Sequence, residues 1–487
     1  MTPAKQTKKR LELLPKSLTG IPGMDEITGG GLPQGRPTLV AGAAGCGKTL
    51  FAMEFLVNGA THYDEPGVFV SFEENAEELA QNVASLGFDL KKLSKQKKLI
   101  IDYVRVERSE IEEAGEYDLD GLFIRLGHAI DSIGARRVVL DTIEVLFSAL
   151  SNQGILRAEL QRLFRWLKDK GVSAVITAER GDGTITRFGL EEYVADCVIL
   201  LDHRVNEQMS TRRLRIVKYR GTLHGTNEYP FLITKDGISV LPITSIGLDH
   251  KAPAGRVSTG IKELDEMLGG KGYYRGSSIL LSGTAGTGKS SLAAAFVDAA
   301  CQRGERCLYF SFEESTEQII RNMRSIGINL SPHVKKGSLQ FHVARPTLYG
   351  LEMHLITIHE LIKQHKPDVV VLDPITDFFA VGSHAEVKAV LTRIIDFLKA
   401  NQITALFTSY TEEDTPNESV VGVSSLIDTW ISLRNLENRG ERQRGLFILK
   451  SRGMPHSNQI RSFNLTDGGI KIGALDLAGR RAELNSA

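Results

Sequence analysis

Short runs of apolar residues alternate with longer stretches of helical periodicity along this chain. The runs Val68–Val70, Val138–Leu140, Ala174–Ile176 and Val198–Leu200 are continuous, without the polar alternation of a strand that faces water on one side. Such runs are typical of strands that are buried on both faces of a parallel sheet. Strands alternating with helices predict an α/β fold, in which a mostly parallel twisted sheet is flanked by helices.

The pattern occurs twice. GAAGCGKT at 42–49 is matched by GTAGTGKS at 283–290, and SFEE at 71–74 is matched by SFEE at 311–314. The motif K-x-R-G-x-x-H at 218–224 returns at 450–456, and the offset between copies drifts only from 241 to 232 residues. Ordered matches of this kind indicate two copies of one domain. We expect a disordered N-terminal tail at 1–15, domains at 16–245 and 257–472, a linker at 246–256 and a short C-terminal tail at 473–487.

Composition narrows the class of protein. Basic and acidic side chains balance at 59 each, which does not favour a nucleic-acid binder. The four cysteines lack disulfide or metal-ligand spacing and are expected to be buried or incidental thiols of a reduced protein. We find no apolar stretch near the ~20 residues of a membrane span and no signal core after the basic N-terminus. The sequence therefore predicts a cytoplasmic protein.

Both glycine-rich octapeptides have the GxxxxGK[ST] form of a P-loop, each between an apolar run and a helical pattern. The glycines let backbone N–H groups turn toward phosphate oxygens at the positive end of the following helix. Lys48 and Lys289 are expected to contact the β- and γ-phosphates, and the hydroxyl groups of Thr49 and Ser290 are expected to bind Mg²⁺. Cys46 would contribute its backbone, with the thiol a bystander. The predicted cofactors are ATP and Mg²⁺, and the predicted ATP-binding positions are Gly42, Gly45, Cys46, Gly47, Lys48, Thr49, Leu50, Gly283, Gly286, Thr287, Gly288, Lys289, Ser290 and Ser291. Each half is therefore expected to be a RecA-like P-loop domain.

Asp141 and Asp373 end apolar runs, as the carboxylate that serves the magnesium ion does in P-loop ATPases. The alternative is an aspartate that caps the next helix. The repeated position beside a P-loop favours the metal role for both residues.

Two glutamate pairs form the next candidate group. Glu73-Glu74 and Glu313-Glu314 each follow an apolar run and precede a helical pattern. Alone, such a pair would be a solvated helix start, but beside a P-loop a carboxylate can orient or deprotonate an attacking oxygen. All four are catalytic candidates, and the first of each pair is favoured as the base.

Each half ends with two cations one residue apart, Lys218 with Arg220 and Lys450 with Arg452. On a strand, side chains at this spacing point to one face. That face is either solvated or reaches the triphosphate of a neighbouring subunit, as an arginine finger does in trans.

The tandem P-loops, both SFEE segments and the paired K-x-R-G-x-x-H motifs resemble the KaiC family, the double RecA-type ATPases of bacterial circadian clocks. The resemblance spans about residues 16 to 472 and implies a double-ring homohexamer with ATP between subunits. It implies slow ATP hydrolysis in the first domain, serine autokinase and autophosphatase activity in the second, and Glu313 as a further metal ligand. It also implies that the nucleotide sites are lined by Ser85, Lys218, Tyr219, Arg220, Thr222, His224, Thr234 and Lys235 in the first half, and by Arg444, Lys450, Ser451, Arg452 and His456 in the second.

Ser424-Ser425 stand where the family has its phosphorylated Ser-Thr pair, so both are predicted phosphorylation sites. The first half has Glu191-Glu192 at this place, so one copy carries fixed charge where the other has hydroxyls. Without the resemblance, two serines would be a helix cap or a loop. The resemblance implies a KaiB-like partner, whereas the short C-terminal tail argues against a KaiA-like activator.

Two other functions fit a tandem P-loop chain. One is a RecA-like DNA-directed ATPase, against which stand the balanced charge and the lack of a DNA-binding module. The other is an ATP-dependent oligomeric scaffold without turnover, against which stand the intact glutamate pairs.

Overall fold

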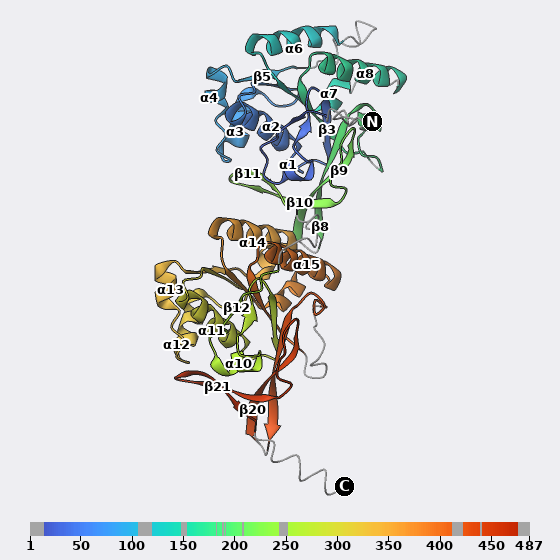
Figure 1. The fold of residues 1–487 in the computed structure, drawn as a ribbon. Helices are drawn as coiled ribbons and strands as arrows, with labels where there is room; N and C mark the ends of the chain where they lie inside the picture. Colours follow the sequence, from blue (N-terminus) through green and yellow to red (C-terminus); the bar gives the residue numbers. More distant parts are fainter. Residues whose placement is uncertain are drawn as a thin grey trace, which may run out of the picture. The chain divides into compact units, whose positions relative to one another are not determined.

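Two α/β units follow each other along the chain, residues 1–245 and 246–487. The structure is a computed structural model that describes residues 14–105, 119–147, 153–181, 183–187, 189, 191–206, 209–242, 252–411, 422–438 and 441–475. Figure 1 shows a central sheet with helices packed on its faces in each unit. In the described part of the chain, no helix is both long enough and apolar enough to cross a membrane.

The first unit is built on a nine-stranded sheet in the order β11-β10-β9-β8-β3-β7-β6-β4-β5. The six strands from β8 to β5 are parallel, and β9 to β11 extend the sheet antiparallel. A two-stranded sheet of β1 and β2 precedes it. The described elements are β1 Lys16–Ser17, α1 Met24–Ile27, β2 Leu32–Pro33, β3 Pro37–Gly42, α2 Lys48–His62, β4 Gly67–Ser71, α3 Ala76–Ala84, α4 Leu90–Lys95, β5 Leu99–Tyr103, α6 Asp120–Ile133, β6 Arg137–Asp141, α7 Ile143–Phe147, α8 Gln153–Asp169, β7 Ser173–Glu179, α9 Glu191–Val194, β8 Cys197–Asn206, β9 Met209–Tyr219, β10 Glu228–Thr234 and β11 Gly237–Val240.

The second unit repeats this topology, with the order β16-β15-β17-β18-β14-β19-β20-β21-β22. Strands β16 to β19 are parallel, β20 to β22 are antiparallel, and β12 and β13 form a separate pair. Its described elements are β12 Arg256–Val257, α10 Lys262–Met267, β13 Tyr273–Tyr274, β14 Ser278–Gly283, α11 Lys289–Gln302, β15 Cys307–Ser311, α12 Thr316–Arg324, α13 Ser331–Lys336, β16 Leu339–Val343, η1 Pro346–Leu348, α14 Leu351–His365, β17 Val369–Asp373, η2 Ile375–Ala380, α15 His384–Ala400, β18 Thr404–Ser409, β19 Thr429–Asn438, β20 Glu441–Ser451, β21 Arg461–Thr466 and β22 Gly469–Ala474. The predicted fold class, two tandem RecA-like domains, is confirmed.

The apolar runs form strands with two buried faces, as predicted. In β6, Val139 packs on the side of α2, α3 and α4, whereas Val138 and Leu140 pack on the side of α6, α7 and α8. Successive side chains of a strand point to opposite faces, so every residue of the run must be apolar when helices cover both.

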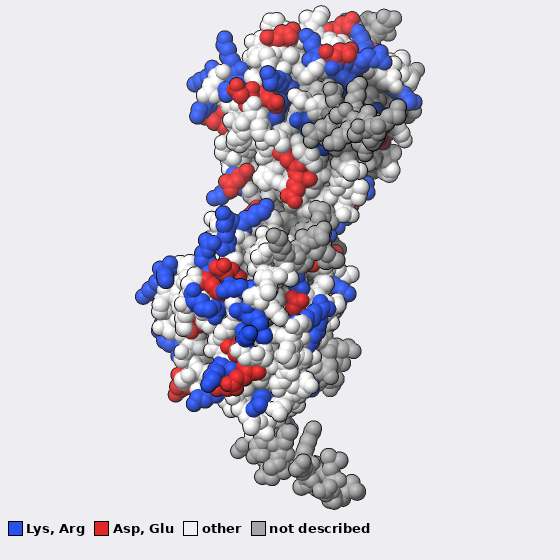
Figure 2. Space-filling view, in the orientation of Figure 1, with Lys and Arg blue, Asp and Glu red and all other residues white. Residues whose placement is uncertain are grey.

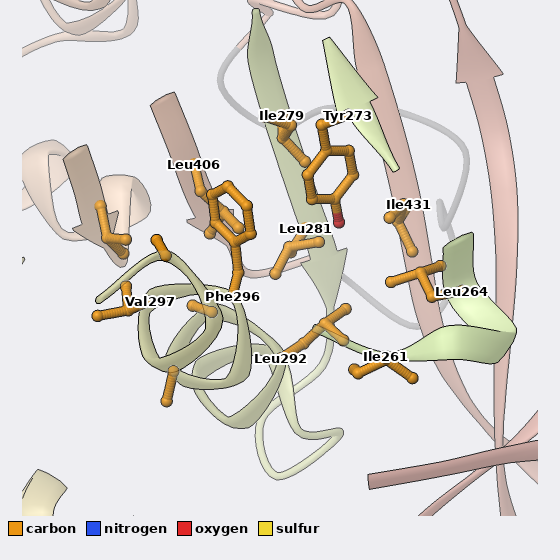
Figure 3. Close-up of a cluster of buried hydrophobic side chains, with 14 of the residues drawn as sticks. Ile261, Leu264, Tyr273, Ile279, Leu281, Leu292, Phe296, Val297, Leu406 and Ile431 are labelled. Carbon is orange, nitrogen blue, oxygen red and sulfur yellow. The ribbon is translucent and has the colours of Figure 1, made fainter. Parts of the chain in front are cut away.

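The P-loop helix of the second unit is held against the sheet by a dense core. In Figure 3, Leu292, Phe296 and Val297 on α11 face Ile279 and Leu281 on β14. All five are at most 2% exposed. This packing fixes the start of α11, and with it the P-loop, relative to the carboxyl ends of the strands.

In Figure 2, basic and acidic side chains are interspersed over the drawn face of each unit, in keeping with the equal totals. The four cysteines are free and buried, as predicted.

Candidate nucleotide sites

The first P-loop connects β3 to α2. Gly45 and Gly47 have φ angles of +72° and +104°, which favour glycine, and Gly47 precedes α2 as an N-cap residue that offers no side-chain cap. The Lys48 ammonium donates to the carbonyl oxygens of Gly42 and Ala43 at 2.9 and 3.0 Å. An uncapped helix start with a lysine over the loop is suited to bind phosphate.

The second P-loop has the same geometry. Lys289 Nζ donates to the carbonyl oxygens of Gly283 and Thr284, both at 2.8 Å. Burial lowers the pKa of Lys289 to about 8, against the opposing influence of Asp373 and Glu313. A triphosphate would replace the carbonyl oxygens as the partner of this ammonium and favour its charged form.

The remaining P-loop residues lie in the two loops or in the first turns of α2 and α11. Cys46 and Thr287 are fully buried, so their side chains pack inward. Burial raises the pKa of the Cys46 thiol. The other predicted positions in these segments are Thr49, Leu50, Gly286, Gly288, Ser290 and Ser291.

The two strand-end aspartates are held by the strand between them and the P-loop strand. Thr177 on β7 donates to Asp141, and Thr408 on β18 donates to Asp373. Thr49 of the P-loop also donates to Asp141; burial raises the pKa of that carboxyl, and the threonine bonds oppose this. A hydroxyl and a carboxylate meeting beside a phosphate loop fit the oxygen-ligand preference of Mg²⁺.

The first glutamate of each pair is held by a hydroxyl group. Thr142 Oγ1 donates to Glu73 Oε1 at 3.1 Å, and Tyr410 Oη donates to Glu313 Oε2 at 2.7 Å. Both glutamates lie just beyond the carboxyl ends of β4 and β15, at the edge of the sheet where the P-loop lies. This edge is where parallel sheets place their ligands.

The second glutamate of each pair is turned toward the next helix. Asn82 on α3 donates to Glu74 at 3.2 Å, and Asn322 on α12 donates to Glu314 at 3.0 Å. Burial and the neighbouring Asp373 raise the pKa of Glu314. Anchoring of the second glutamates to amides supports the first of each pair as the residue that faces a reacting group.

The K-x-R cations lie at one end of the strands, and the P-loop of the same chain lies at the other end. Lys218 is opposite Val198, which is beside Leu39 near the start of β3. Gly42, where the loop begins, is level with Leu214 of β9. Leu214 and Lys218 are four residues apart, which is about 13 Å along the strand. The second unit repeats this register, with Lys450 opposite Trp430 and level with Leu280.

These cations hold the segment that carries the predicted phosphorylation sites. Lys450 Nζ donates to the carbonyl oxygen of Ser424 at 2.8 Å, and Arg452 donates to that of Ser425 at 2.6 Å. In the first unit, Lys218 donates to the carbonyl oxygen of Glu192 at 2.8 Å. Other contacts here are Arg220 to the carbonyl oxygen of Tyr193, Tyr219 to that of Gly31, Lys16 to Thr222, and Ser451 to Thr429.

A hairpin beside each P-loop carries other predicted residues. Thr234 is the last residue of β10, and Lys235 lies between β10 and β11. The Ile233 side chain of β10 lies 3.1 Å from where a Cβ on Gly47 would be. Arg444 lies on β20 toward the P-loop edge, and Ser85 is exposed at the end of α3. His224 and His456 follow β9 and β20 and are half-buried.

Sequence reasoning missed Thr142, Tyr410 and Phe463. Phe463 on β21 is buried and lies 2.6 Å from where a Cβ on Gly288 would be. The repeat offers a signal for this hairpin, since TKDG at 234–237 is answered by TDGG at 466–469.

Each unit has a phosphate loop with a lysine, an aspartate at the end of the strand two places away in the sheet, and a glutamate bonded to a hydroxyl group. Together these features define a tandem P-loop ATPase. A family model described as "ATPase: KaiC" matches the chain twice, over residues 17–245 and 257–476. The chain belongs to the KaiC family and is an ATP-binding ATPase.

Curated relatives extend over nearly the whole chain. It is 58% identical to the circadian clock protein KaiC2 of Synechocystis sp. over 460 residues, covering 94% of this chain and 81% of that protein. It is 39% identical to the circadian clock oscillator protein KaiC of Parathermosynechococcus lividus, covering 94% and 85%. It is also 39% identical to KaiC3 of Synechocystis sp., covering 93% and 91%.

Proposed function

We propose that this chain is an ATP-driven timing protein whose first domain, 16–245, hydrolyses ATP. Its second domain, 257–472, joined by a linker at 246–256, phosphorylates and dephosphorylates serines of the same protein. The clock names of the relatives support the timing role. A KaiB-like protein is the partner that this role implies.

The observation that carries the proposal is the separation of the P-loop from the K-x-R cations across each sheet. A cation at the opposite edge cannot reach the triphosphate bound to its own chain, but it can reach that of an adjacent subunit. Each site is therefore shared, and we propose a double-ring homohexamer with ATP between subunits. Lys218 and Arg220 complete the first site, and Lys450 and Arg452 complete the second.

The glutamates determine the two reactions. Glu73 orients a water molecule toward the γ-phosphate in the first site. Glu313 takes the proton of a serine hydroxyl of the adjacent subunit while the new Oγ–P bond forms and the bond from phosphorus to ADP breaks. Thr49 with Asp141, and Ser290 with Asp373 and Glu313, would hold Mg²⁺, which neutralises charge on the transferring phosphoryl group.

Ser424 and Ser425 are suited to be acceptors. Ser424 is half-buried and Ser425 is exposed, in a turn before β19 at the sheet edge opposite Glu313. A phosphoserine adds roughly −1.5 to −2 charge. A phosphorylated second domain would thus carry charge at the place where the first has Glu191 and Glu192.

The test is incubation of the full-length protein with labelled ATP and Mg²⁺, followed by site mapping and a mass measurement of the assembly. We expect six copies per particle and label on Ser424 or Ser425. Glu313→Gln should abolish the serine label. Glu73→Gln should remove most ATP turnover but leave the serine label in place. Glu74→Gln, which alters the carboxyl anchored by Asn82, is the matched control and should have a smaller effect on turnover.

Three outcomes would contradict the proposal. ATP consumption without label on either serine would remove the kinase function. Strong stimulation of turnover by single-stranded DNA would favour a DNA-directed ATPase. Ring assembly on ATP without any turnover would leave a scaffold.

A further inference from the structure

Glu313 is held by an aromatic side chain that also covers the P-loop lysine. Tyr410 directly follows β18, the strand between the P-loop strand β14 and the aspartate strand β17. Its hydroxyl donates to Glu313 Oε2 at 2.7 Å, and its ring centroid lies 4.2 Å from Lys289 Nζ. One side chain therefore contacts the candidate base and the candidate phosphate ligand together.

The first unit has no tyrosine at the equivalent position. Thr177 and Thr408 occupy equivalent places, because each donates to the aspartate of its own unit. Two residues after these threonines come Glu179 and Tyr410. In the first unit the hydroxyl bonded to the glutamate comes instead from Thr142, next to the aspartate.

The second unit cannot use that alternative. The residue after Asp373 is Pro374, which has no hydroxyl, where the first unit has Thr142. A hydroxyl donor to the glutamate is therefore present in both units, but it comes from the residue after β6 in the first unit and from the residue after β18 in the second. This exchange indicates that the bond serves the glutamate rather than the local packing.

The hydroxyl has a chemical consequence at Glu313. A carboxylate has two oxygens, and Tyr410 occupies one, Oε2. The other, Oε1, then has a defined direction in which to accept a proton from an attacking hydroxyl. A tyrosine hydroxyl is protonated at neutral pH, so Tyr410 can donate this bond.

We propose that Tyr410 is the positioning residue of the second site: its hydroxyl orients Glu313 for proton transfer, and its ring seats Lys289 under the γ-phosphate. The inference rests on the proposed role of Glu313 as base. Phosphoryl transfer in the second domain depends on a phenol, and ATP hydrolysis in the first domain does not.

The experiment uses the full-length protein with Glu73→Gln, which silences the first site so that ATP turnover reports the second. In Tyr410→Phe the ring over Lys289 is kept and the hydroxyl is lost. We expect kcat for turnover and the initial rate of serine labelling to fall on the order of 10- to 100-fold, with KM for ATP within about twofold. Tyr410→Ala, which also removes the ring, should raise KM as well.

Tyr349→Phe is the matched control, because it removes an exposed phenol of the same unit and should leave kcat and KM unchanged. An unchanged kcat in Tyr410→Phe would overturn the inference, as would a rise in KM alone. Label on Tyr410 itself would make it an acceptor and overturn it too.

The measurements distinguish failure of the proposed kinase function from failure of the inference about Tyr410. If the unsubstituted serines take no label, the kinase proposal fails, but the second-site turnover of Tyr410→Phe still decides the role of the phenol. If Glu313→Gln leaves that turnover intact, Glu313 is not the base, and the premise of the inference is removed.

Discussion

Arg137 is a buried guanidinium in the first unit, and its replacement by valine is a test of how the two halves differ. The residue is 1% exposed and donates to Glu65 at 2.6 Å and to the carbonyl oxygens of Phe55 and Leu18 at 2.7 and 2.8 Å. Burial lowers its pKa, and Glu65 opposes this. Loss of one partner of a buried ion pair costs about 3–5 kcal/mol, which we expect for Arg137→Val.

A second substitution, Gly59→Ala, extends this test to a double-mutant cycle. A Cβ on Gly59 would lie 2.5 Å from Arg137 Cδ. Gly59→Ala should therefore destabilise the unsubstituted protein. In the Arg137→Val background it should stabilise by about 1–2 kcal/mol, from one buried methyl group and better helix propensity. The second unit already has this combination, with alanine at 300 and valine at 369.

The two tryptophans allow each unit to be read alone. Trp166 belongs to the first unit and Trp430 to the second. With Trp430→Phe, urea unfolding followed by Trp166 fluorescence should show the midpoint of Arg137→Val lowered by about 1–2 M. With Trp166→Phe, the transition of the second unit should not move. A shift equivalent to less than about 1 kcal/mol, or a Gly59→Ala effect of the same sign in both backgrounds, would refute the reasoning.

Further predictions concern pH and backbone geometry. Glu54 is 2% exposed, and burial raises its pKa from 4.5 to about 7. Because the folded state then holds more protons than the unfolded state, the free energy of unfolding should fall by up to about 3 kcal/mol as the pH rises from about 4.5 through 7. Urea titrations should show this pH dependence flattened in Glu54→Gln. Lys289 has a pKa of about 8, so kcat/KM of the Glu73→Gln protein should fall as pH rises through that value. Gly260 and Gly304 share a φ of +85°, but a Cβ on Gly260 would lie 2.9 Å from the Ala295 carbonyl oxygen, whereas one on Gly304 meets nothing within 4 Å. Gly304→Ala should therefore cost about 1–2 kcal/mol in urea unfolding, and Gly260→Ala on the order of 1–3 kcal/mol more.

The sequence was sufficient for features that depend on neighbouring residues. The runs around Val68 and Val139 predict doubly buried strands, because pleating alone determines that both faces are apolar. The P-loops follow from glycine positions and a lysine before a hydroxyl residue. The repeat then locates Asp141 and Asp373 at strand ends.

Contacts between distant segments were beyond sequence reasoning. Tyr410 reaches Glu313 only because β18 lies between β14 and β17, an order that no local pattern states. Likewise, Lys450 lies opposite Trp430 because of a register that depends on the whole sheet. The burial of Arg137 depends on Gly59, which is 78 residues earlier in the chain.

Lys450 and Arg452 donate to the carbonyl oxygens of Ser424 and Ser425. If these cations also serve the nucleotide of an adjacent subunit, as proposed, the serine segment and that nucleotide compete for them. In the proposed assembly, a triphosphate that draws these cations loosens the serines of the chain that lends them. Linkage requires the reverse effect at equal strength: a phosphoserine that binds them more tightly weakens the neighbour's hold on its nucleotide by the same factor. Each subunit would thus sense the nucleotide of one neighbour through the state of its own serines, and that neighbour's nucleotide affinity would in turn report the state of those serines.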